Sequence, residues 1–488
     1  MRFAGHLDKL VPEPQPSSVT ALLHRIAAVA AYPITWLAPS MSTADGHAMR
    51  RGLFRDLAAG LGYSAQVVLI DEQEYEGYYD AGANIIWSAW HGIEDDVPLR
   101  CDAQRPLASL ASYTHVNRQM TARVAEVAAE GAVVAVQDFQ FMLAPAMIRA
   151  QRPDVRIVHF SHVPFPDTAS LTRLPPVIAR TLVNGMLGAD LLGFQRALWA
   201  HRFLRCCERL GLDVDQERGH VRHRGRRTWV RCYPVSVDVA YLTGRSKEPE
   251  VRRWAARTVA SDRAVRIARV DRLDPAKNAL RGFEAYSLLL RRRPDLARDV
   301  RFVACLVPTR ERVPEYQRYA THVRRVIYDV NRRHPGSIMV HYGNNQDRAF
   351  GVLHGYDVLL ANSVADGMNL VAQEGSVLNT KDGAVVLSTG TGSADLLSGA
   401  VILDRPRDVV ATADALEVAL SLSPVERRDR ARRMLAAISR MNGAEWLDCQ
   451  LADALAVGGG SAPSCPLPVL PADPAPDPAE DLAPEARP

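Results

Sequence analysis

The hydrophobic positions of the chain form short continuous runs separated by segments with helical spacing. In the first half the runs span residues 34–38, 66–70, 132–138, 156–162 and 190–195. In the second half they span residues 265–270, 300–307, 338–342, 357–363 and 384–388. An apolar run without alternation predicts a strand that is covered on both faces, which is typical of parallel sheets. We therefore predict an α/β protein whose ligands lie at the carboxyl ends of its strands.

The strand and helix alternation stops near residues 231–238 and then restarts, which indicates two successive doubly wound units facing each other across a cleft. We expect an N-terminal Rossmann-like domain over residues 1–236, a second one over 237–435, and a closing helix over 436–456. Residues 457–488 hold nine of the 31 prolines and several carboxylates. Such a composition cannot bury a core, so this tail is predicted to be disordered.

Composition and net charge limit the classes of function that the chain can have. The chain has 488 residues, 47% of them apolar, and a net charge of +4 with scattered arginines, so nothing calls for nucleic acid while small anionic substrates fit. Its seven cysteines form no C-x-x-C pair or metal-binding spacing, which is typical of free thiols in a reducing cytosol. No signal peptide or membrane span is evident. We expect a cytoplasmic protein without a metal or cofactor, either a monomer or a homo-oligomer.

Residues 366–374 follow the run at 357–363 and begin a segment with helical spacing. A strand, a turn and a helix N-terminus together form a natural site for a phosphate group. Asp366 would face another part of such a ligand, for example a sugar hydroxyl, and Glu374 could reach a ribose. Alternatively, Asp366 is only the N-cap and Glu374 a solvated helix residue.

Cations follow two strands of the second unit. Arg272 and Lys277, after the run at 265–270, could converge on a diphosphate and neutralise charge on a leaving group. Arg310 follows the run at 300–307 and could hold an acceptor phosphate. Solvated arginine and lysine side chains are the alternative, because such residues are common on surfaces.

Polar residues also end two neighbouring strands of the first unit. Asp138 and His162 follow the runs at 132–138 and 156–162, and parallel strands bring such ends to one sheet edge. The alternatives are a helix cap for Asp138 and a satisfied, half-buried histidine for His162. Tyr79 and Trp87 could stack on a ligand or belong to the core.

The sequence holds no paired carboxylates at suitable strand ends, no G-x-S-x-G elbow, no G-x-x-x-x-G-K-[ST] loop and no metal cluster. Cations that grip phosphate, without a nucleophile, indicate group transfer from an activated phosphate ester.

Seven ordered motifs carry a resemblance to a known family. They lie at residues 136–145, 162–166, 188–194, 234–238, 272–277, 307–316 and 366–374. They resemble the retaining glycosyltransferases that include trehalose-6-phosphate synthase. The resemblance implies a GT-B fold, a nucleotide-sugar donor and glucose 6-phosphate as the acceptor. It further implies front-face transfer, in which the leaving phosphate takes the proton of the acceptor.

The resemblance also implies roles for single residues. Arg272 and Lys277 would bind the diphosphate, Glu374 the ribose, and Asp366 and His162 the transferred glucose. Backbone N–H groups in the stretch after Asp366 would assist. The implied donor site comprises Asp366, Gly367, Met368, Asn369, Leu370, Val371 and Glu374. The implied acceptor site comprises Tyr79, Trp87, Asp138 and Arg310. His162 and Asp138 join Arg272 and Lys277 as the expected catalytic residues.

The chain departs from the family pattern in several places. Residues 16–18 stand where a glycine pair belongs, and the strand and arginine expected before them are missing. In the motif around Asp138, Gln137 and Gln140 replace the usual histidine. The Tyr79 to Trp87 interval is one residue short, and the loop at residues 390–394 is unusual. These departures resemble the pseudo-glycosyltransferase branch that joins a nucleotide-activated cyclitol to an aminocyclitol phosphate. A non-catalytic sugar-phosphate-binding protein is the third hypothesis.

Overall fold

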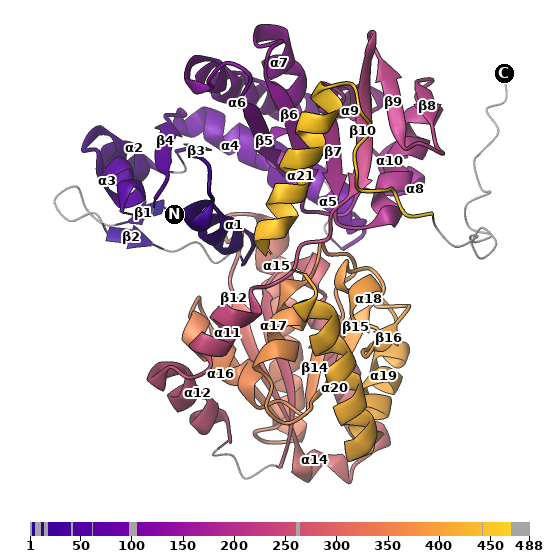
Figure 1. The fold of residues 1–488 in the computed structure, drawn as a ribbon. Helices are drawn as coiled ribbons and strands as arrows, with labels where there is room; N and C mark the ends of the chain where they lie inside the picture. Colours follow the sequence, from indigo (N-terminus) through magenta and orange to yellow (C-terminus); the bar gives the residue numbers. More distant parts are fainter. Residues whose placement is uncertain are drawn as a thin grey trace. The chain divides into compact units, whose positions relative to one another are not determined.

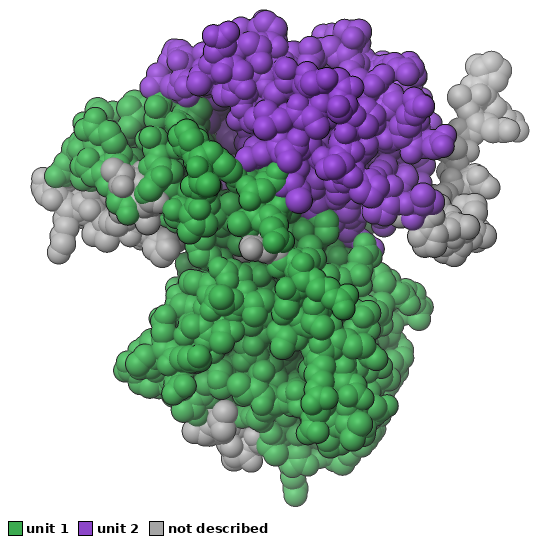
Figure 2. Space-filling view, in the orientation of Figure 1, with its two compact units in different colours: residues 1–72, 91–100, 234–448 green, residues 73–90, 101–233, 449–488 purple. Residues whose placement is uncertain are grey.

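The computed structural model describes residues 2–4, 11–13, 18–40, 42–60, 62–96, 105–259, 264–441 and 443–469. The chain divides into two compact units (Figure 2). Unit 1 comprises residues 1–72, 91–100 and 234–448, and unit 2 comprises residues 73–90, 101–233 and 449–488. The change at Pro234 lies close to the boundary expected at residue 236. The grouping of residues 1–72 with the second half of the chain differs from the expected N-terminal domain 1–236.

Unit 1 contains a six-stranded parallel sheet with the order β13-β12-β11-β14-β15-β16 (Figure 1). Its strands are β11 (Val265–Arg272), β12 (Val300–Val307), β13 (Ile338–Tyr342), β14 (Val358–Ala361), β15 (Ala384–Ser388) and β16 (Val401–Leu403). Its helices are α11 (Val239–Arg245), α12 (Pro249–Val259), α13 (Ala279–Arg292), α14 (Leu296–Asp299), α15 (Pro314–Arg333), α16 (Gln346–His354), α17 (Leu370–Leu378), α18 (Ser393–Leu396), α19 (Val409–Ser421) and α20 (Pro424–Ser439), with a 3-10 turn η3 (Pro275–Lys277).

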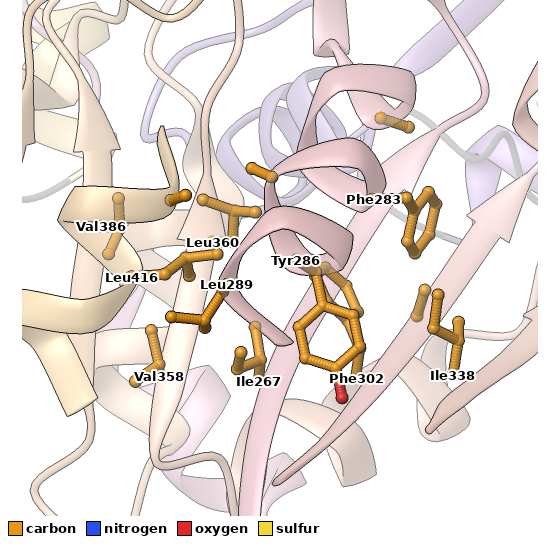
Figure 3. Packing of buried hydrophobic residues seen from close by; sticks show 14 of the residues in the cluster. Ile267, Phe283, Tyr286, Leu289, Phe302, Ile338, Val358, Leu360, Val386 and Leu416 are labelled. Atoms are coloured by element: carbon orange, nitrogen blue, oxygen red, sulfur yellow. The ribbon is translucent and has the colours of Figure 1, made fainter. Parts of the chain in front are cut away.

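The core of unit 1 is packed between α13 and the sheet (Figure 3). Phe283, Tyr286 and Leu289 recur at helical spacing on α13 and are fully buried. The ring of Phe283 lies 4.9 Å from that of Phe302 on β12. Burial of each such side chain stabilises the fold by about 1.5–3 kcal/mol. This packing fixes the carboxyl end of β11, where the predicted cations begin.

The described residues up to Val68 join neither six-stranded sheet. They form β1 (Arg2–Ala4), β2 (Val11–Glu13), α1 (Ser18–Val29), β3 (Thr35–Pro39), α2 (Thr43–Arg50), α3 (Leu53–Ala59) and β4 (Ser64–Val68). β3 pairs only with β4, in parallel. The hydroxyl of Tyr32 donates to Asp448 at 2.9 Å, and Leu22 and Ile26 of α1 lie against Gly443. These contacts explain why this segment groups with unit 1.

Unit 2 contains a second six-stranded sheet with the order β5-β6-β7-β10-β9-β8 (Figure 1). Its strands are β5 (Val133–Gln137), β6 (Arg156–Ser161), β7 (Leu191–Phe194), β8 (Asp213–Asp215), β9 (His220–His223) and β10 (Arg226–Cys232). The helical segments begin with α4 (Glu72–Asp80), the π-helix η1 (Ala81–Ile86) and α5 (Trp87–His91), and continue with α6 (Arg105–Val127), the 3-10 turn η2 (Phe139–Phe141), α7 (Ala144–Gln151), α8 (Thr168–Thr172), α9 (Pro176–Met186) and α10 (Ala197–Arg209). β8 and β9 extend the parallel part as an antiparallel meander.

All ten predicted strands form, at or within a few residues of their expected limits. The closing helical segment is divided into α20 and α21 (Gly443–Gly458), and α20 starts with a capping box made by Ser423 and Glu426. Of the tail predicted from residue 457, residues 459–469 belong to unit 2 and residues 470–488 lie outside the described residues. Within the described chain no helix is both long and apolar enough to cross a membrane.

A buried ion-pair network joins three elements of unit 2. Asp190 precedes β7 and is 5% exposed. Its carboxylate accepts from Arg149 of α7 at 2.5 Å, from Arg226 of β10 at 2.8 Å, and from the N–H of Ile157 on β6 at 2.8 Å. Every bond to this carboxylate is charge-assisted.

Replacement of Asp190 by alanine leaves the guanidinium of Arg149 buried without its partner. We expect Asp190→Ala to lower the free energy of unfolding by about 3 kcal/mol, measured by chemical denaturation. Asp414→Ala removes an exposed ion pair with Arg292 and should change the free energy by less than about 1 kcal/mol. Equal effects of the two variants would contradict a structural role for the Asp190 network.

Candidate active site

The predicted cations of unit 1 lie at the carboxyl end of β11. Arg272 is the last residue of this strand, and Lys277 ends the turn η3 that follows. Asp274, which is fully buried, starts this turn as its N-cap and accepts from the N–H of Ala276 at 3.0 Å. Pro275 takes the first position of the turn, where no N–H is needed. The sequence Asp274-Pro275 thus fixes the backbone turn between Arg272 and Lys277.

Lys277 is held between carboxylates. Its ammonium forms an ion pair with Asp366, and its Nζ lies 4.0 Å from Asp271 Oδ1. Arg269, whose side chain is fully buried, lies 3.0 Å from Asp271 and also donates to the carbonyl of Lys277. Burial raises the pKa of Asp271, although Arg269 and Lys277 oppose this effect. The structure therefore joins the predicted phosphate ligand, Lys277, to the predicted sugar ligand, Asp366.

Arg272 and Arg310 converge on one carboxylate. Their guanidinium groups lie 3.7 Å and 3.8 Å from Asp274 Oδ2, and Arg310 also bonds the hydroxyl of Tyr316. Burial favours a higher pKa for Asp274, but the two guanidiniums outweigh it and hold the pKa below its ordinary value. Arg310 has a positive φ of 51°, a strained conformation that is enriched at functional sites.

The start of α17 is capped by Asn369, which corrects the alternative that Asp366 is the N-cap. Asn369 has a φ of 55°, and its Oδ1 accepts from the N–H of Ala372 at 3.1 Å. Its Nδ2 donates to Asp366 at 3.0 Å and to Ser363 at 3.3 Å. An asparagine directly before an apolar helical run is a cap signal that the sequence already contained. The cap leaves the carboxylate of Asp366 to Lys277 and Asn369.

The unusual loop at residues 390–394 packs closely on the stretch after Asp366. The N–H of Asp366 donates to the carbonyl of Gly390 at 3.0 Å, and the N–H of Gly392 donates to the carbonyl of Gly367 at 2.6 Å. A Cβ at Gly390 would lie 2.2 Å from the carbonyl oxygen of Val364, and one at Gly392 would lie 2.4 Å from that of Gly367. Both positions therefore require glycine, and the loop fixes Gly367 and Met368 beside the helix start.

Glu374 lies one further turn along α17 in a pocket of unit 1. The pocket is lined by residues of α1, α11, α16 and α17, among them Arg25, Tyr241, Gln346, Phe350, Leu370 and Glu374. Burial raises the pKa of Glu374 to about 7, with Arg25 acting against it. The guanidinium of Arg25 lies 4.2 Å from the ring centre of Tyr241. Val371 follows Leu370 on the first turn of α17. Pro16 and Ser17, which stand where the family pattern has a glycine pair, lie outside the described residues.

In unit 2, His162 has polar partners on both ring nitrogens. Its Nε2 lies 2.8 Å from the amide oxygen of Gln137, and its Nδ1 lies 3.4 Å from the amide nitrogen of Gln195. Because an amide oxygen only accepts, Nε2 carries the proton and Nδ1 accepts from Gln195. Burial lowers the pKa of His162 to about 3, so the ring is neutral. Gln137, noted only as a departure from the family pattern, thus holds the ring of His162.

Asp138 is not a helix cap, which corrects the alternative reading of this residue. Its side chain makes no cap hydrogen bond to η2, and Oδ1 instead accepts from the N–H of His162 at 3.0 Å. Its backbone has φ 68° and ψ 179°, a region that glycine occupies almost alone and that costs on the order of 1–3 kcal/mol for other residues. The structure therefore brings Asp138 and His162 together, as predicted from their strand ends.

The two aromatic candidates flank the π-helix η1. Trp87 is 7% exposed and packs on Phe139 with ring centres 5.6 Å apart. Tyr79 is 37% exposed and stacks on Tyr75 at 6.0 Å. The interval between Tyr79 and Trp87, which is one residue short of the family pattern, forms a π-helix. This form is frequent at functional sites.

Several residues of the two clusters were missed by sequence reasoning. Arg269 and Asp271 interrupt the apolar run of β11 with charge, which in a doubly covered strand signals a buried pair. Gln195 follows β7 in the same way that His162 follows β6. Among the described residues no three His, Cys, Asp or Glu side chains gather as a metal site would require.

The buried histidines predict a pH dependence of stability. Burial lowers the pKa of His159 to about 4 and that of His162 to about 3, from an ordinary 6.5. The unfolded chain therefore binds more protons below pH 6.5, and stability is fully present above this pH and falls as the pH falls. Between pH 6.5 and 5 we expect a loss on the order of 2 kcal/mol per histidine.

Chemical denaturation of wild type and His162→Gln at both pH values measures this loss. On acidification the variant should lose on the order of 2 kcal/mol less stability than the wild type. An unchanged pH dependence in the variant would show that His162 is not neutral in the folded state.

Comparisons with known proteins show which family the chain is similar to. The model of glycosyltransferase family 20 matches residues 17–456. A trehalose-6-phosphate synthase of Mycolicibacterium smegmatis is 31% identical over 422 residues, which cover 83% of this chain and 82% of the relative. One from Mycobacterium avium is 34% identical over 405 residues, 79% of each chain.

Solved structures show the same fold. An α,α-trehalose-phosphate synthase (UDP-forming) from Burkholderia xenovorans, solved in complex with glucose-6-phosphate, has a TM-score of 0.74 at 26% identity and covers 81% of this chain and 88% of that one. A trehalose-6-phosphate protein of E. coli bound with UDP-2-fluoro glucose has a TM-score of 0.77 at 22% identity, covering 91% and 97%. The predicted GT-B fold class is confirmed. With a family model that spans most of its length and relatives above 30% identity, this chain belongs to glycosyltransferase family 20.

Proposed function

We propose that this enzyme transfers glucose from UDP-glucose to glucose 6-phosphate, with retention at the anomeric carbon, and so forms α,α-trehalose 6-phosphate. The main observation that supports this proposal is the cluster of Arg272, Lys277 and Asp366. It lies at the carboxyl end of a parallel sheet and beside a helix N-terminus. This cluster offers two cations to a diphosphate and one carboxylate to a sugar.

The names of the relatives support both substrates. Relatives that align over about four fifths of the chain are trehalose-6-phosphate synthases. The Burkholderia xenovorans structure was solved with glucose-6-phosphate, and a structure from Burkholderia vietnamiensis at 26% identity is named UDP-forming. These names favour UDP over GDP, the two bases that the sequence left open.

In the proposed reaction the bond between the anomeric carbon and the diphosphate oxygen breaks, and a bond to the acceptor hydroxyl oxygen forms on the same face. The proton of that hydroxyl passes to the leaving diphosphate. Arg272 and Lys277 stabilise the negative charge that builds on this leaving group, and the N–H groups at the start of α17 add their dipole. Positively charged, preorganised groups of this kind carry the catalysis without a covalent intermediate.

The carboxylates and the histidine position the sugars. Asp366 accepts a hydrogen bond from a hydroxyl of the transferred glucose while Asn369 holds its orientation, and Glu374 accepts hydrogen bonds from the ribose. From unit 2 we assign His162 to the glucose, and Asp138, Tyr79 and Trp87 to the acceptor, with Arg310 of unit 1 on the acceptor phosphate. We propose that the reaction takes place in the cytoplasm and needs no metal.

The direct test is incubation of the purified protein with UDP-glucose and glucose 6-phosphate. We expect release of UDP and a disaccharide phosphate with an α,α linkage by NMR. Arg272→Ala should reduce kcat by about 100-fold to 1000-fold, because one stabiliser of the leaving group is lost. Arg325→Ala, at an exposed position of α15, should keep the wild-type rate.

If no product forms with UDP-glucose and none forms with GDP-glucose, the proposal is refuted. Turnover only with a nucleotide-activated cyclitol and an aminocyclitol phosphate would instead assign the chain to the cyclitol branch. Binding of nucleotide sugar without any turnover would support the non-catalytic hypothesis.

The raised pKa of Glu374 gives the donor site a pH dependence. With a pKa of about 7, this carboxyl is partly protonated at neutral pH, and only the ionised form accepts from both ribose hydroxyls. We therefore expect the affinity for UDP to rise about tenfold between pH 6 and 8, measured by calorimetry. Glu374→Gln should bind UDP more weakly at pH 8 and with little pH dependence.

The exposed carboxylate of Glu417, which pairs with Arg293, provides the matched control. Glu417→Gln should follow the wild-type pH profile. If Glu374→Gln kept the full tenfold rise, another group would be responsible for it.

A further inference from the structure

An arginine-rich surface lies on the β9–β10 hairpin of unit 2. It consists of Arg218, Arg222, Arg224 and Arg227, all of them exposed, and we call it the arginine surface. The hairpin turns at Arg224 and Gly225, both with positive φ, as a two-residue type I′ turn requires. The proposed transfer reaction makes no use of these residues.

The arginine surface is only partly balanced by the neighbouring carboxylates of Asp213 and Asp215. Arg222 lies directly opposite Arg227 in the antiparallel ladder, and like charges in such cross-strand pairs are destabilising. Arg222 has one exposed ion pair with Asp213 at 3.4 Å. Within the described part of the chain, Arg224 and Arg227 have no acidic side chain within ion-pair distance. This arrangement favours binding of an anionic segment.

The end of the described chain is anchored beside this surface. Asp453 of α21 is 1% exposed and accepts from the hydroxyl of Tyr233 at 2.5 Å and from both the N–H and the hydroxyl of Ser464 at 2.6 Å. These bonds hold the segment after α21 against β10.

The next residues lead to the hairpin itself. The carbonyl of Pro468 accepts from His201 of α10 at 3.0 Å. A Cβ at Gly219, the residue before β9, would lie 2.9 Å from Leu467. The described chain therefore ends close to the base of the strand that carries Arg222.

The following sequence is acidic and rich in proline. Residues 470–488 contain Asp473, Asp477, Glu480, Asp481 and Glu485, against one basic residue, Arg487. An extended proline-rich chain advances about 3.1 Å per residue, so Asp473 reaches about 19 Å from Leu467. The strand from Gly219 to Arg224 spans about 17 Å. The first carboxylates of the tail can thus reach every member of the arginine surface.

We propose that residues 470–488 bind to the arginine surface of the same molecule through their carboxylates. Tethering at Leu467 gives the segment a high effective concentration at this surface, so weak exposed ion pairs suffice to hold it. The proposal is independent of the transfer reaction, because it rests on β9, β10 and the tail alone.

The test is cleavage of the full-length protein by a glutamate-specific endopeptidase, with release of tail fragments at Glu480 and Glu485 followed by intact mass spectrometry. A synthetic peptide of residues 470–488 in the same buffers corrects for effects on the protease. At low salt we expect the tail to be cleaved about fivefold more slowly than the peptide, and at about 0.5 M NaCl at the same rate.

The variant Arg222→Gln/Arg224→Gln/Arg227→Gln should lose this protection at low salt. The control Arg325→Gln/Arg332→Gln/Arg333→Gln changes three exposed arginines of α15 and should keep it. Asp473→Asn/Asp477→Asn/Asp481→Asn should also lose protection, and combining it with the hairpin variant should cause no further change. Thermal unfolding confirms that each variant is folded.

Equal cleavage of wild type and the hairpin variant would overturn the proposal. If the hairpin variant then lost retention on a polyanion column, the arginine surface would instead serve an external polyanion. Protection that increased with protein concentration would assign the tail to a second copy and would likewise overturn binding within one molecule.

Discussion

The cation cluster of unit 1 depends on buried ion pairs at the carboxyl end of β11. Arg269 and Asp271 of β11 are charged and almost completely buried, and each would be costly to bury alone. Together they hold the carbonyl and the ammonium of Lys277. Asp274 does the same for Arg272 and Arg310. The cations that a diphosphate requires are therefore prepositioned by carboxylates that the protein itself supplies.

In unit 2 the site is built from neutral groups and backbone strain. Neither Gln137 nor Gln195 can titrate, so the proton on His162 stays at Nε2 over the physiological pH range. Asp138 is held in a conformation that suits glycine, and the N–H of His162 bonds its carboxylate. Such strain is stable only when the surrounding structure fixes it, and the hydrogen bond of Asp138 N–H to Phe160 across the β5–β6 ladder does so. The result is a carboxylate and a neutral ring in one fixed relation.

Much of the fold and of the two clusters was predictable, because a parallel strand leaves two signals in a sequence. Continuous apolar runs located the strands, and the polar residues that end them located Asp138, His162, Arg272 and Arg310. What the sequence did not indicate are contacts between residues far apart in the chain. Lys277 and Asp366 are 89 residues apart, and nothing in either segment shows that they form an ion pair. The capping role of Asn369 was not assigned, although an asparagine directly before an apolar helical run is a cap signal.

The departures from the family pattern gained their meaning only from three-dimensional contacts. Gln137 looked like a lost histidine, yet its amide oxygen is the acceptor that sets the tautomer of His162. The glycines at 390 and 392 looked like an unusual loop, yet they let the backbone approach Val364 and Gly367. The meander of β8 and β9 was not predicted, since its short strands carry arginine and histidine instead of a continuous apolar run.

The charges at the end of β11 also constrain how a donor can bind. Arg269, Arg272, Lys277 and Arg310 contribute four positive charges, and Asp271, Asp274 and Asp366 contribute three negative ones. The cluster thus has a single excess positive charge, while a diphosphate diester has two negative ones. Asp366 is the carboxylate whose proposed partner is a sugar hydroxyl, and it is also the ion-pair partner of Lys277. When Asp366 turns to that hydroxyl, the ammonium of Lys277 becomes available to the diphosphate. Recognition of the sugar and activation of the leaving group would then be coupled through one carboxylate.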